Sequence, residues 1–133
     1  MERRLISSGS PYEPVVGYSR AVVAGERIFV AGCAPVMPDG ADPPPDTYGQ
    51  TKRCLEIIER ALAEAGASLR DVVRTRVYLT AGADFDEFGR AHGEAFREIR
   101  PANTTVIAGG LVDPRWLVEI EAEAVTTTKG DGT

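Results

Sequence analysis

One segment near the end of the chain, Trp116–Val125, alternates between apolar and charged residues and restricts the possible folds more than any other feature. Its apolar positions are Val118, Ile120, Ala122 and Ala124, and its acidic positions are Glu119, Glu121 and Glu123. Side chains of a β-strand point to opposite faces in turn, so this spacing predicts a strand with one apolar and one charged face. Within one chain, other elements need to cover only the apolar face of a sheet built on such a strand.

A second segment, Val72–Thr80, has the matching pattern with positive charges. We predict that Val73, Thr75, Val77 and Leu79 lie on the apolar face and that Arg74, Arg76 and Tyr78 lie on the charged face. Two interpretations of this mixed-charge face remain open. Either it is an ordinary solvated surface whose ion pairs are worth about 0–1 kcal/mol each, or it packs against the sheets of other copies in an oligomer. In the oligomer, the two arginines would pair with Glu121 or Glu123 in partial burial.

Hydrophobic spacing and turn residues predict the remaining elements. Helices are expected at about 46–65 and 84–99, further strands at 5–7, 19–23, 27–31 and 104–108, and loops at about 9–14 and 37–45. The resulting order β, ββ, α, β, α, ββ predicts an α+β fold in which two helices cover one face of a mixed sheet. The whole chain, residues 1–133, is interpreted as a single domain with a frayed tail at 126–133.

The composition argues against several classes of protein. No apolar run approaches the ~18 residues of a membrane helix, and the first residues lack the apolar segment of a secretory signal. A net charge of −5 and a pI of about 4.9 disfavour binding to nucleic acid through its phosphate backbone. We therefore expect a globular cytoplasmic protein.

The chain has one histidine, His92, and two cysteines, Cys33 and Cys54, without a CxxC motif. So few scattered ligands argue against a structural zinc site. Reduced thiols are the preferred interpretation of the cysteines, although a disulfide between them stays open. A catalytic dyad of Cys33 and His92 is disfavoured, because His92 lies on the apolar stripe of the second predicted helix. The other members of that stripe are Phe85, Phe88, Phe96 and Ile99.

Six short motifs follow one another in the order in which they occur in one known family. They are GYSRAV at 17–22, IFVAGCAP at 28–35, QT at 50–51 with AGA at 65–67, DVVRTRVYLT at 71–80, RPA at 100–102 and LVEIEA at 117–122. The likeness extends over about residues 5–125. In this order the motifs resemble the Rid family, the YjgF-type reactive-intermediate deaminases that are also labelled endoribonuclease L-PSP.

The resemblance implies a fold, an assembly and an activity. Members of the family have a chorismate-mutase-like mixed sheet with two helices on one face, and they form homotrimers with a central barrel and clefts between subunits. Their characterised activity is hydrolysis of reactive imines and enamines to ammonia and a 2-oxo acid, without a metal or an organic cofactor. The expected partners are a small metabolite and other copies of the chain, with no nucleic acid and no membrane. The acidic pI and the lack of a basic or aromatic stripe argue against the RNA cleavage named in the family label.

The resemblance also implies site residues. Glu119 matches the glutamate that positions water, and Tyr18 matches the tyrosine that lines the pocket. Gly32 matches the glycine whose backbone borders the pocket, and Thr105 matches a position whose main chain contacts the ligand. Each has an ordinary alternative role: Glu119 as the partner of an arginine, Tyr18 in packing, Gly32 as a strand-end glycine and Thr105 as a β-branched strand residue.

Asn103 is the main departure from the family, whose deaminases have at this position an arginine that binds the substrate carboxylate. An arginine donates two charge-assisted hydrogen bonds to a carboxylate, so a neutral amide predicts ~10²-fold weaker binding of simple amino-acid-derived imines. Arg20, Arg74 or Arg76 would restore the charge by reaching the cleft; alternatively, the ligand is neutral and amide-like. The sequence thus predicts a Rid-like hydrolase of unassigned substrate, with a non-catalytic small-ligand-binding or interaction trimer as the alternative.

Overall fold

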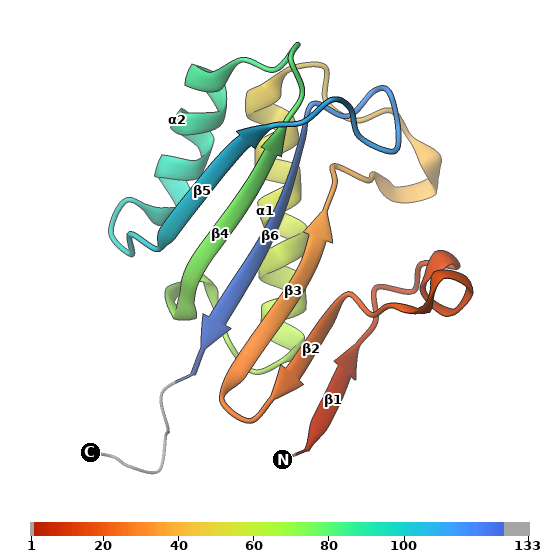
Figure 1. Ribbon diagram of the computed structural model, residues 1–133, viewed down its shortest axis with the longest axis vertical. Coiled ribbons are helices and arrows are strands. Elements are labelled where there is room, and N and C mark those ends of the chain that lie inside the picture. Colours follow the sequence, from red (N-terminus) through yellow and green to blue (C-terminus); the bar gives the residue numbers. More distant parts are fainter. Residues whose placement is uncertain (1, 127–133) are drawn as a thin grey trace.

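The computed structural model describes residues 2–126 of the chain (Figure 1). Within these residues, six strands form one mixed sheet in the order β1-β2-β3-β6-β4-β5. The strands are β1 Arg3–Ile6, β2 Ala21–Ala24, β3 Arg27–Cys33, β4 Val72–Leu79, β5 Ala102–Ile107 and β6 Val118–Val125. Neighbouring strands pair antiparallel except for β4 and β5, which are parallel. This arrangement confirms the predicted α+β class and the mixed sheet.

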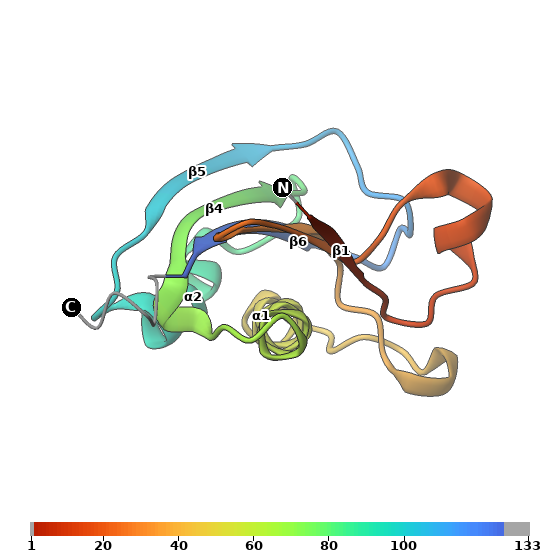
Figure 2. The same ribbon diagram turned by 90° about the horizontal axis from the view of Figure 1, so that it is seen from below.

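Helices α1 (Thr47–Glu64) and α2 (Phe85–Phe96) pack on the same face of the sheet, as Figure 2 shows. Each helix begins at an aspartate, Asp46 or Asp84, whose carboxylate accepts a hydrogen bond from a backbone N–H of the first turn. α1 ends before Gly66, whose φ of 84° favours glycine. Three shorter helical turns complete the described chain: η1 Glu13–Gly17, η2 Pro38–Gly40 and η3 Leu69–Asp71.

The apolar core lies between the two helices and the sheet. Ile58 and Leu62 of α1, Val77 of β4 and Ile120 of β6 are each 0% exposed. Because these side chains face the helices, the register of β4 and β6 is fixed. The acidic residues of β6, which alternate with the buried ones, are therefore held on the opposite face of the sheet.

Replacing Ile58 by alanine should lower the free energy of unfolding by about 2–5 kcal/mol, because it removes buried methyl groups and leaves a cavity. Truncation of Val112, which is 92% exposed, to alanine should change it by less than about 0.5 kcal/mol. Urea unfolding of both variants measures the difference. Equal stabilities would contradict the packing described for α1.

The prediction for Val73 is wrong. This side chain is 46% exposed, and Val72 is buried in its place. The pairing of β4 with β6 shifts between Val72 and Arg74, so the alternation of buried and exposed residues changes phase by one residue. From Thr75 onward the two faces are those predicted from the sequence.

Two further local predictions need correction. Phe85, expected on the buried stripe of α2, is 61% exposed because it stands at the first position of the helix, where its ring packs on Phe88. The loop predicted at about 9–14 ends in the π-helical turn η1 (Glu13–Gly17), and the buried Glu13 accepts hydrogen bonds from the backbone and hydroxyl of Ser8. The tail predicted at 126–133 lies outside the described residues except for Thr126.

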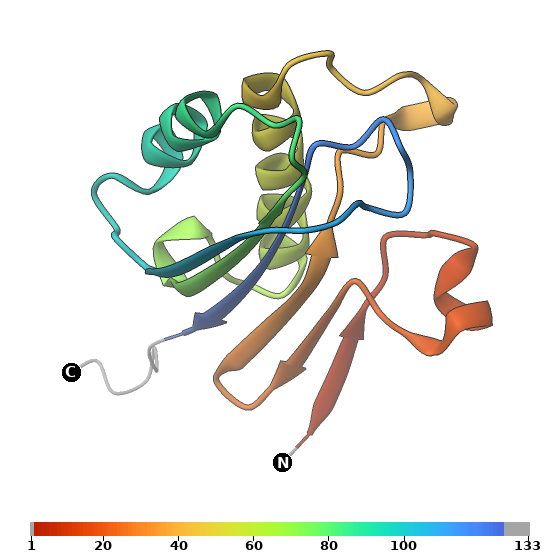
Figure 3. The ribbon, with the colours of Figure 1, turned by 45° about the horizontal axis from the view of Figure 1, so that its top comes forward.

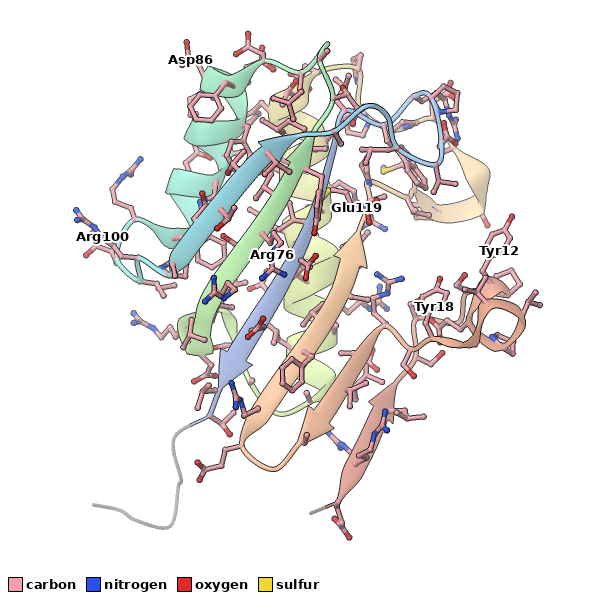
Figure 4. The ribbon with its side chains drawn as sticks, viewed as in Figure 1. Tyr12, Tyr18, Arg76, Asp86, Arg100 and Glu119 are labelled. Atoms are coloured by element: carbon pink, nitrogen blue, oxygen red, sulfur yellow. The ribbon has the colours of Figure 1, made fainter. Side chains whose placement is uncertain are left out.

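The face of the sheet opposite the helices carries paired charges (Figure 4). Arg76 Nη1 lies 2.7 Å from Glu121 Oε1, and Arg74 Nε lies 4.0 Å from Glu123 Oε2. Each arginine stands directly opposite its partner in the register of β4 with β6. Both pairs form within one chain, so these four charges compensate one another without a second copy. As partly exposed pairs they are worth about 0–1 kcal/mol each.

Candidate functional site

Glu119 differs from the other glutamates of β6 because, within residues 2–126, its carboxylate has no hydrogen-bond or ion-pair partner. Its neighbour on the charged face, Glu121, accepts hydrogen bonds from Arg76 and from the Tyr78 hydroxyl, which lies 2.6 Å from Oε2. Tyr78 stands opposite Glu119 in the register, but its hydroxyl reaches the next glutamate instead. Within residues 2–126, no group donates a hydrogen bond to the Glu119 carboxylate. Its oxygens are therefore available to a ligand or a water molecule.

The surroundings of Glu119 raise its pKa. Burial is the main cause, and repulsion by Glu121 adds to it, whereas the positive charge of Arg20 acts in the opposite direction. A carboxyl group with a raised pKa exchanges protons closer to neutral pH than an ordinary glutamate. Glu119 thus combines free oxygens with a pKa suited to proton transfer.

Glu119→Gln should raise the free energy of unfolding at neutral pH, because it removes a partly buried charge that Glu121 repels. A carboxyl group whose folded pKa exceeds its unfolded value, near 4.5, stabilises the fold fully below that value and loses this contribution as the pH rises through the folded pKa. The advantage of the variant should therefore appear above about pH 4.5 and grow until Glu119 is fully ionised. Urea unfolding at several pH values measures it. An advantage that grows toward low pH would contradict the assigned cause.

Gly32 lies against the Glu119 carboxylate. Gly32 stands where the pairing of β3 with β6 is irregular, between Val30 and Cys33. A Cβ at position 32 would collide with Glu119 Oε2 and would lie 3.2 Å from Cδ. Position 32 is thus occupied by a glycine because the carboxylate approaches it so closely.

Arg20 and Tyr18 belong to the same group of side chains. Arg20 Nη1 donates to Gly32 O at 2.7 Å and to Cys33 Sγ at 3.3 Å. The guanidinium carbon of Arg20 lies 5.6 Å from the centroid of the Tyr18 ring. Because the Arg20 charge also acts on Glu119, the four residues Tyr18, Arg20, Gly32 and Glu119 form one contiguous group, which we call the Glu119 cluster. Figure 4 labels its two ends, Tyr18 beside η1 and Glu119 on β6.

An open groove of about 600 Å³ lies beside the Glu119 cluster. Its lining includes Gly17, Tyr18, Ala31 and Glu121. The size is that of a pocket for a small metabolite. Glu119 is not part of the lining. Within one chain the groove therefore lies next to the cluster but does not include the free carboxylate of Glu119.

Asn103 and Thr105 lie on the other face of the sheet, toward α2. Asn103 stands opposite the buried Thr75, and its Nδ2 donates to Thr75 Oγ1 at 3.0 Å. Thr105 Oγ1 donates to Asn103 Oδ1 at 2.9 Å, and Thr75 Oγ1 lies 3.0 Å from His92 Nε2. We call these four residues the Asn103 chain. A single copy of the protein does not bring Asn103 and Thr105 together with Glu119.

Cys33 and His92 are also separate. His92 packs against the rings of Phe88 and Phe96, with centroid distances of 5.4 and 4.7 Å, whereas Cys33 contacts Arg20. Burial raises the pKa of the Cys33 thiol, which keeps it protonated, and lowers the pKa of His92. Cys33 and Cys54 are buried free thiols. In the part of the chain that the structure describes, no group of three potential metal ligands occurs and no helix is long and apolar enough to cross a membrane.

Gln50, at the start of α1, holds the chain in place before Glu119. It is 2% exposed; its Nε2 donates to Pro44 O at 2.9 Å and to Arg115 O at 3.0 Å, and its Oε1 accepts from Leu117 N at 2.7 Å. These bonds connect the loop before α1 to the loop before β6, which lie side by side in Figure 3. Sequence reasoning did not single out this role. The available signal is a glutamine at a position of α1 that belongs to the buried face.

Comparisons with known proteins agree with this fold. The family model described as Endoribonuclease L-PSP matches residues 9–126. The crystal structure of Rv2704 from Mycobacterium tuberculosis, of the YjgF/YER057c/UK114 family, is 44% identical and has a TM-score of 0.85, covering 94% of this chain and 100% of that chain. The 3-aminoacrylate deaminase RutC of Acinetobacter baylyi is 33% identical, over 90% of this chain and 94% of its own length. E. coli TdcF with bound serine is 27% identical with a TM-score of 0.77, covering 93% of this chain and 94% of that chain.

These matches span nearly the whole described chain, and they confirm the resemblance carried by the six motifs. The strand order, the two helices on one face and the sequence identity all lead to the same family. The chain belongs to the Endoribonuclease L-PSP family, which is also known as the YjgF or Rid family.

Proposed function

We propose that this protein hydrolyses an imine, an enamine or a related C–N bond of a small metabolite and that Glu119 carries the protons. The observation behind this proposal is the free carboxylate of Glu119, which stands against Gly32 while Glu121 and Glu123 are paired with arginines. Burial raises its pKa, so it exchanges protons closer to neutral pH than an ordinary glutamate. The relative from A. baylyi is named as a deaminase, which supports this class of reaction.

The reaction requires one water molecule and a residue that moves protons. An enamine first takes up a proton on carbon and becomes an imine. Ionised Glu119 accepts a proton from water while the water oxygen bonds to the imine carbon, and Glu119 passes this proton to the nitrogen, which leaves its carboxylate ionised again. Glu119 then transfers a proton from the new hydroxyl to the nitrogen, the C–N bond breaks and a carbonyl forms. One imine and one water thus give one carbonyl compound and one ammonia.

We propose further that the complete site forms between copies of the chain in a homotrimer. The Glu119 cluster and the Asn103 chain lie on opposite faces of the sheet, so both can line one cleft only if they come from different copies. The edge strand β5 also favours contact with another copy, because it exposes apolar side chains. Val106 and Ile107, which point to opposite faces of β5, are 42% and 66% exposed. Tyr18 and Gly32 of one copy, with Asn103 and Thr105 of the next, would then bind the substrate. Sedimentation equilibrium should give three chains per particle, and a monomer at micromolar concentration would contradict this assembly.

An assay with freshly generated 2-imino acids tests the activity. An amino-acid oxidase supplies the imine, and ammonia or 2-oxo acid is measured with and without the protein. The wild type and an Asn103→Arg variant are compared, because the variant adds a cation to the Asn103 chain. We expect acceleration over the uncatalysed rate by at least one of them. No acceleration by either protein would overturn the proposed activity.

A second candidate function is binding of a small ligand without turnover. The amide of Asn103 is neutral and is bonded on both sides within its own chain, to Thr75 and Thr105, so this part of the site offers no charge to a substrate. TdcF, the E. coli relative, has been crystallised with bound serine, which supports binding of a small ligand. Binding of a metabolite together with an unchanged set of activities in a Glu119→Ala variant would favour this candidate.

A further inference from the structure

We propose that Arg20 recognises the anionic group of the ligand, so that the site takes a small molecule whose carboxylate lies beside the reacting carbon. The inference rests on the proposed function, because it concerns the charged group of a ligand at the same site. Its starting point is an arginine whose charge acts on Glu119 and Glu13 only from beyond ion-pair distance. Arg20 is partly buried, and no carboxylate of residues 2–126 forms an ion pair with it.

The guanidinium of Arg20 is held in a fixed position. The two bonds of Nη1, to Gly32 O and Cys33 Sγ, orient one end of the planar group, and the Tyr18 ring lies beside it. A guanidinium has five N–H donors, and those on Nε and Nη2 lie on adjacent nitrogens that match the two oxygens of a carboxylate. The Tyr18 hydroxyl interacts with Arg20 as well. A ligand carboxylate bound to the guanidinium would lie beside this hydroxyl.

The other arginines of the charged face are already bonded. Arg76 donates to Glu121, and Arg74 pairs with Glu123. A ligand carboxylate would have to break one of these pairs to bind there. At Arg20 it would form an ion pair without breaking another one. The structure therefore distinguishes Arg20 from Arg74 and Arg76 as the cation available to the ligand.

Arg20 bonds to the carbonyl oxygen of Gly32 and the Glu119 carboxylate lies against the Cα of the same residue, so together they impose an orientation on the ligand. A carboxylate on Arg20 leaves the adjacent carbon, which carries the nitrogen, close to the free oxygens of Glu119. The bound carboxylate also offsets the charge that lowers the pKa of Glu119. Binding should therefore raise the pKa of Glu119 further and be accompanied by proton uptake at a pH just above it.

The test compares two probes that differ in the proposed group. Pyruvate has a carboxylate beside its carbonyl, and hydroxyacetone has a neutral hydroxymethyl group in its place. Their dissociation constants are measured by NMR titration of the full-length wild type, Arg20→Gln and Arg27→Gln. Arg27 is the matched control, since it also lies over an aromatic ring, at 5.7 Å from Phe29, but outside the Glu119 cluster.

We expect the wild type to bind pyruvate more tightly than hydroxyacetone. Arg20→Gln should weaken pyruvate binding about 10–100-fold and leave hydroxyacetone binding unchanged, because a charged donor is lost. Arg27→Gln should change neither. Arg20→Lys, which keeps the charge without the planar fork, should fall between the wild type and Arg20→Gln.

Three results would overturn the inference: no pyruvate binding by the wild type at millimolar concentration, hydroxyacetone binding as tight as that of pyruvate, or pyruvate binding that survives Arg20→Gln. The comparison of pyruvate with hydroxyacetone uses the wild type alone, so it tests the inference even if the variants fail to fold. Binding of pyruvate through Arg20 without imine hydrolysis would reject the proposed function and support this inference. Hydrolysis with binding that is independent of Arg20 would reject this inference alone.

Discussion

Glu119→Gln should lower kcat/KM for imine hydrolysis by about 10²–10⁴-fold, the usual contribution of a positioned general acid or base. Glutamine keeps the size and shape of the side chain but cannot accept a proton. The carboxylate has no hydrogen-bond partner within residues 2–126, so the substitution breaks no ion pair and the fold should persist. Initial rates of ammonia release, with circular dichroism on the same samples, measure the effect.

Glu123→Gln is the matched control for this variant. It makes the same change on the same strand and the same face, four residues or about 13 Å from Glu119. Glu123 pairs with Arg74 at 4.0 Å and lies outside the Glu119 cluster. Its loss should leave kcat/KM within a factor of about two of the wild type. Equal losses in the two variants would show that the charge of β6, rather than the free carboxylate, determines the rate.

Gly32→Ala should reduce kcat/KM by about 10²-fold, because displacement of a catalytic group by roughly 1 Å has effects of this size. The added methyl group would collide with Glu119 Oε2, and Cδ and Cγ would lie 3.2 and 3.4 Å from it. The atom that must move is the end of a flexible side chain, so the free energy of unfolding should change by less than about 1 kcal/mol. The predicted variant is therefore stable but poorly active. Rate measurements and urea unfolding test the two parts separately.

Gly89→Ala provides the control for Gly32→Ala. Gly89 lies within α2, and a Cβ added there would meet nothing within 4 Å. This variant should keep the wild-type rate and gain up to about 1 kcal/mol of stability, because alanine favours a helix over glycine. A fully active Gly32→Ala variant would mean that the position of the Glu119 carboxylate has no influence on the reaction.

The main elements of the fold follow from residue spacing. The alternation in β6 places Val118 and Ile120 toward the helices and the glutamates on the other face, and the structure has this arrangement. The exposure of Val73 could not be predicted in this way, because the shift in β4 depends on how that strand pairs with β6. Local spacing determines faces only where the pairing between strands is regular.

The site was predictable in part. The family motifs identify Glu119, Gly32 and Tyr18, and their roles toward a substrate stay predictions. Alternation places three glutamates on one face of β6 and cannot tell which of them is unpaired. That depends on the Tyr78 hydroxyl, which reaches diagonally to Glu121.

The separation of Asn103 from Glu119 was not predictable from motifs either. It depends on which face of β5 points toward α2, and the pairing of Asn103 with Thr75 in the parallel register determines that face. The place of Arg20 depends on the end of β3, where the pairing with β6 is irregular and where Gly32 O and Cys33 Sγ accept from the same nitrogen. Contacts of this kind join residues that are adjacent in space only after the sheet has formed.

The most direct test of the role of Glu119 is the pH dependence of kcat/KM for imine hydrolysis, corrected for the uncatalysed rate, in the wild type and Glu119→Gln. Ionised Glu119 is the active form, so wild-type activity should fall as the pH decreases through a pKa raised above 4.5 by burial. The residual activity of the variant should not show this fall as the pH decreases. Identical pH profiles in the two proteins would contradict the assignment of proton transfer to Glu119.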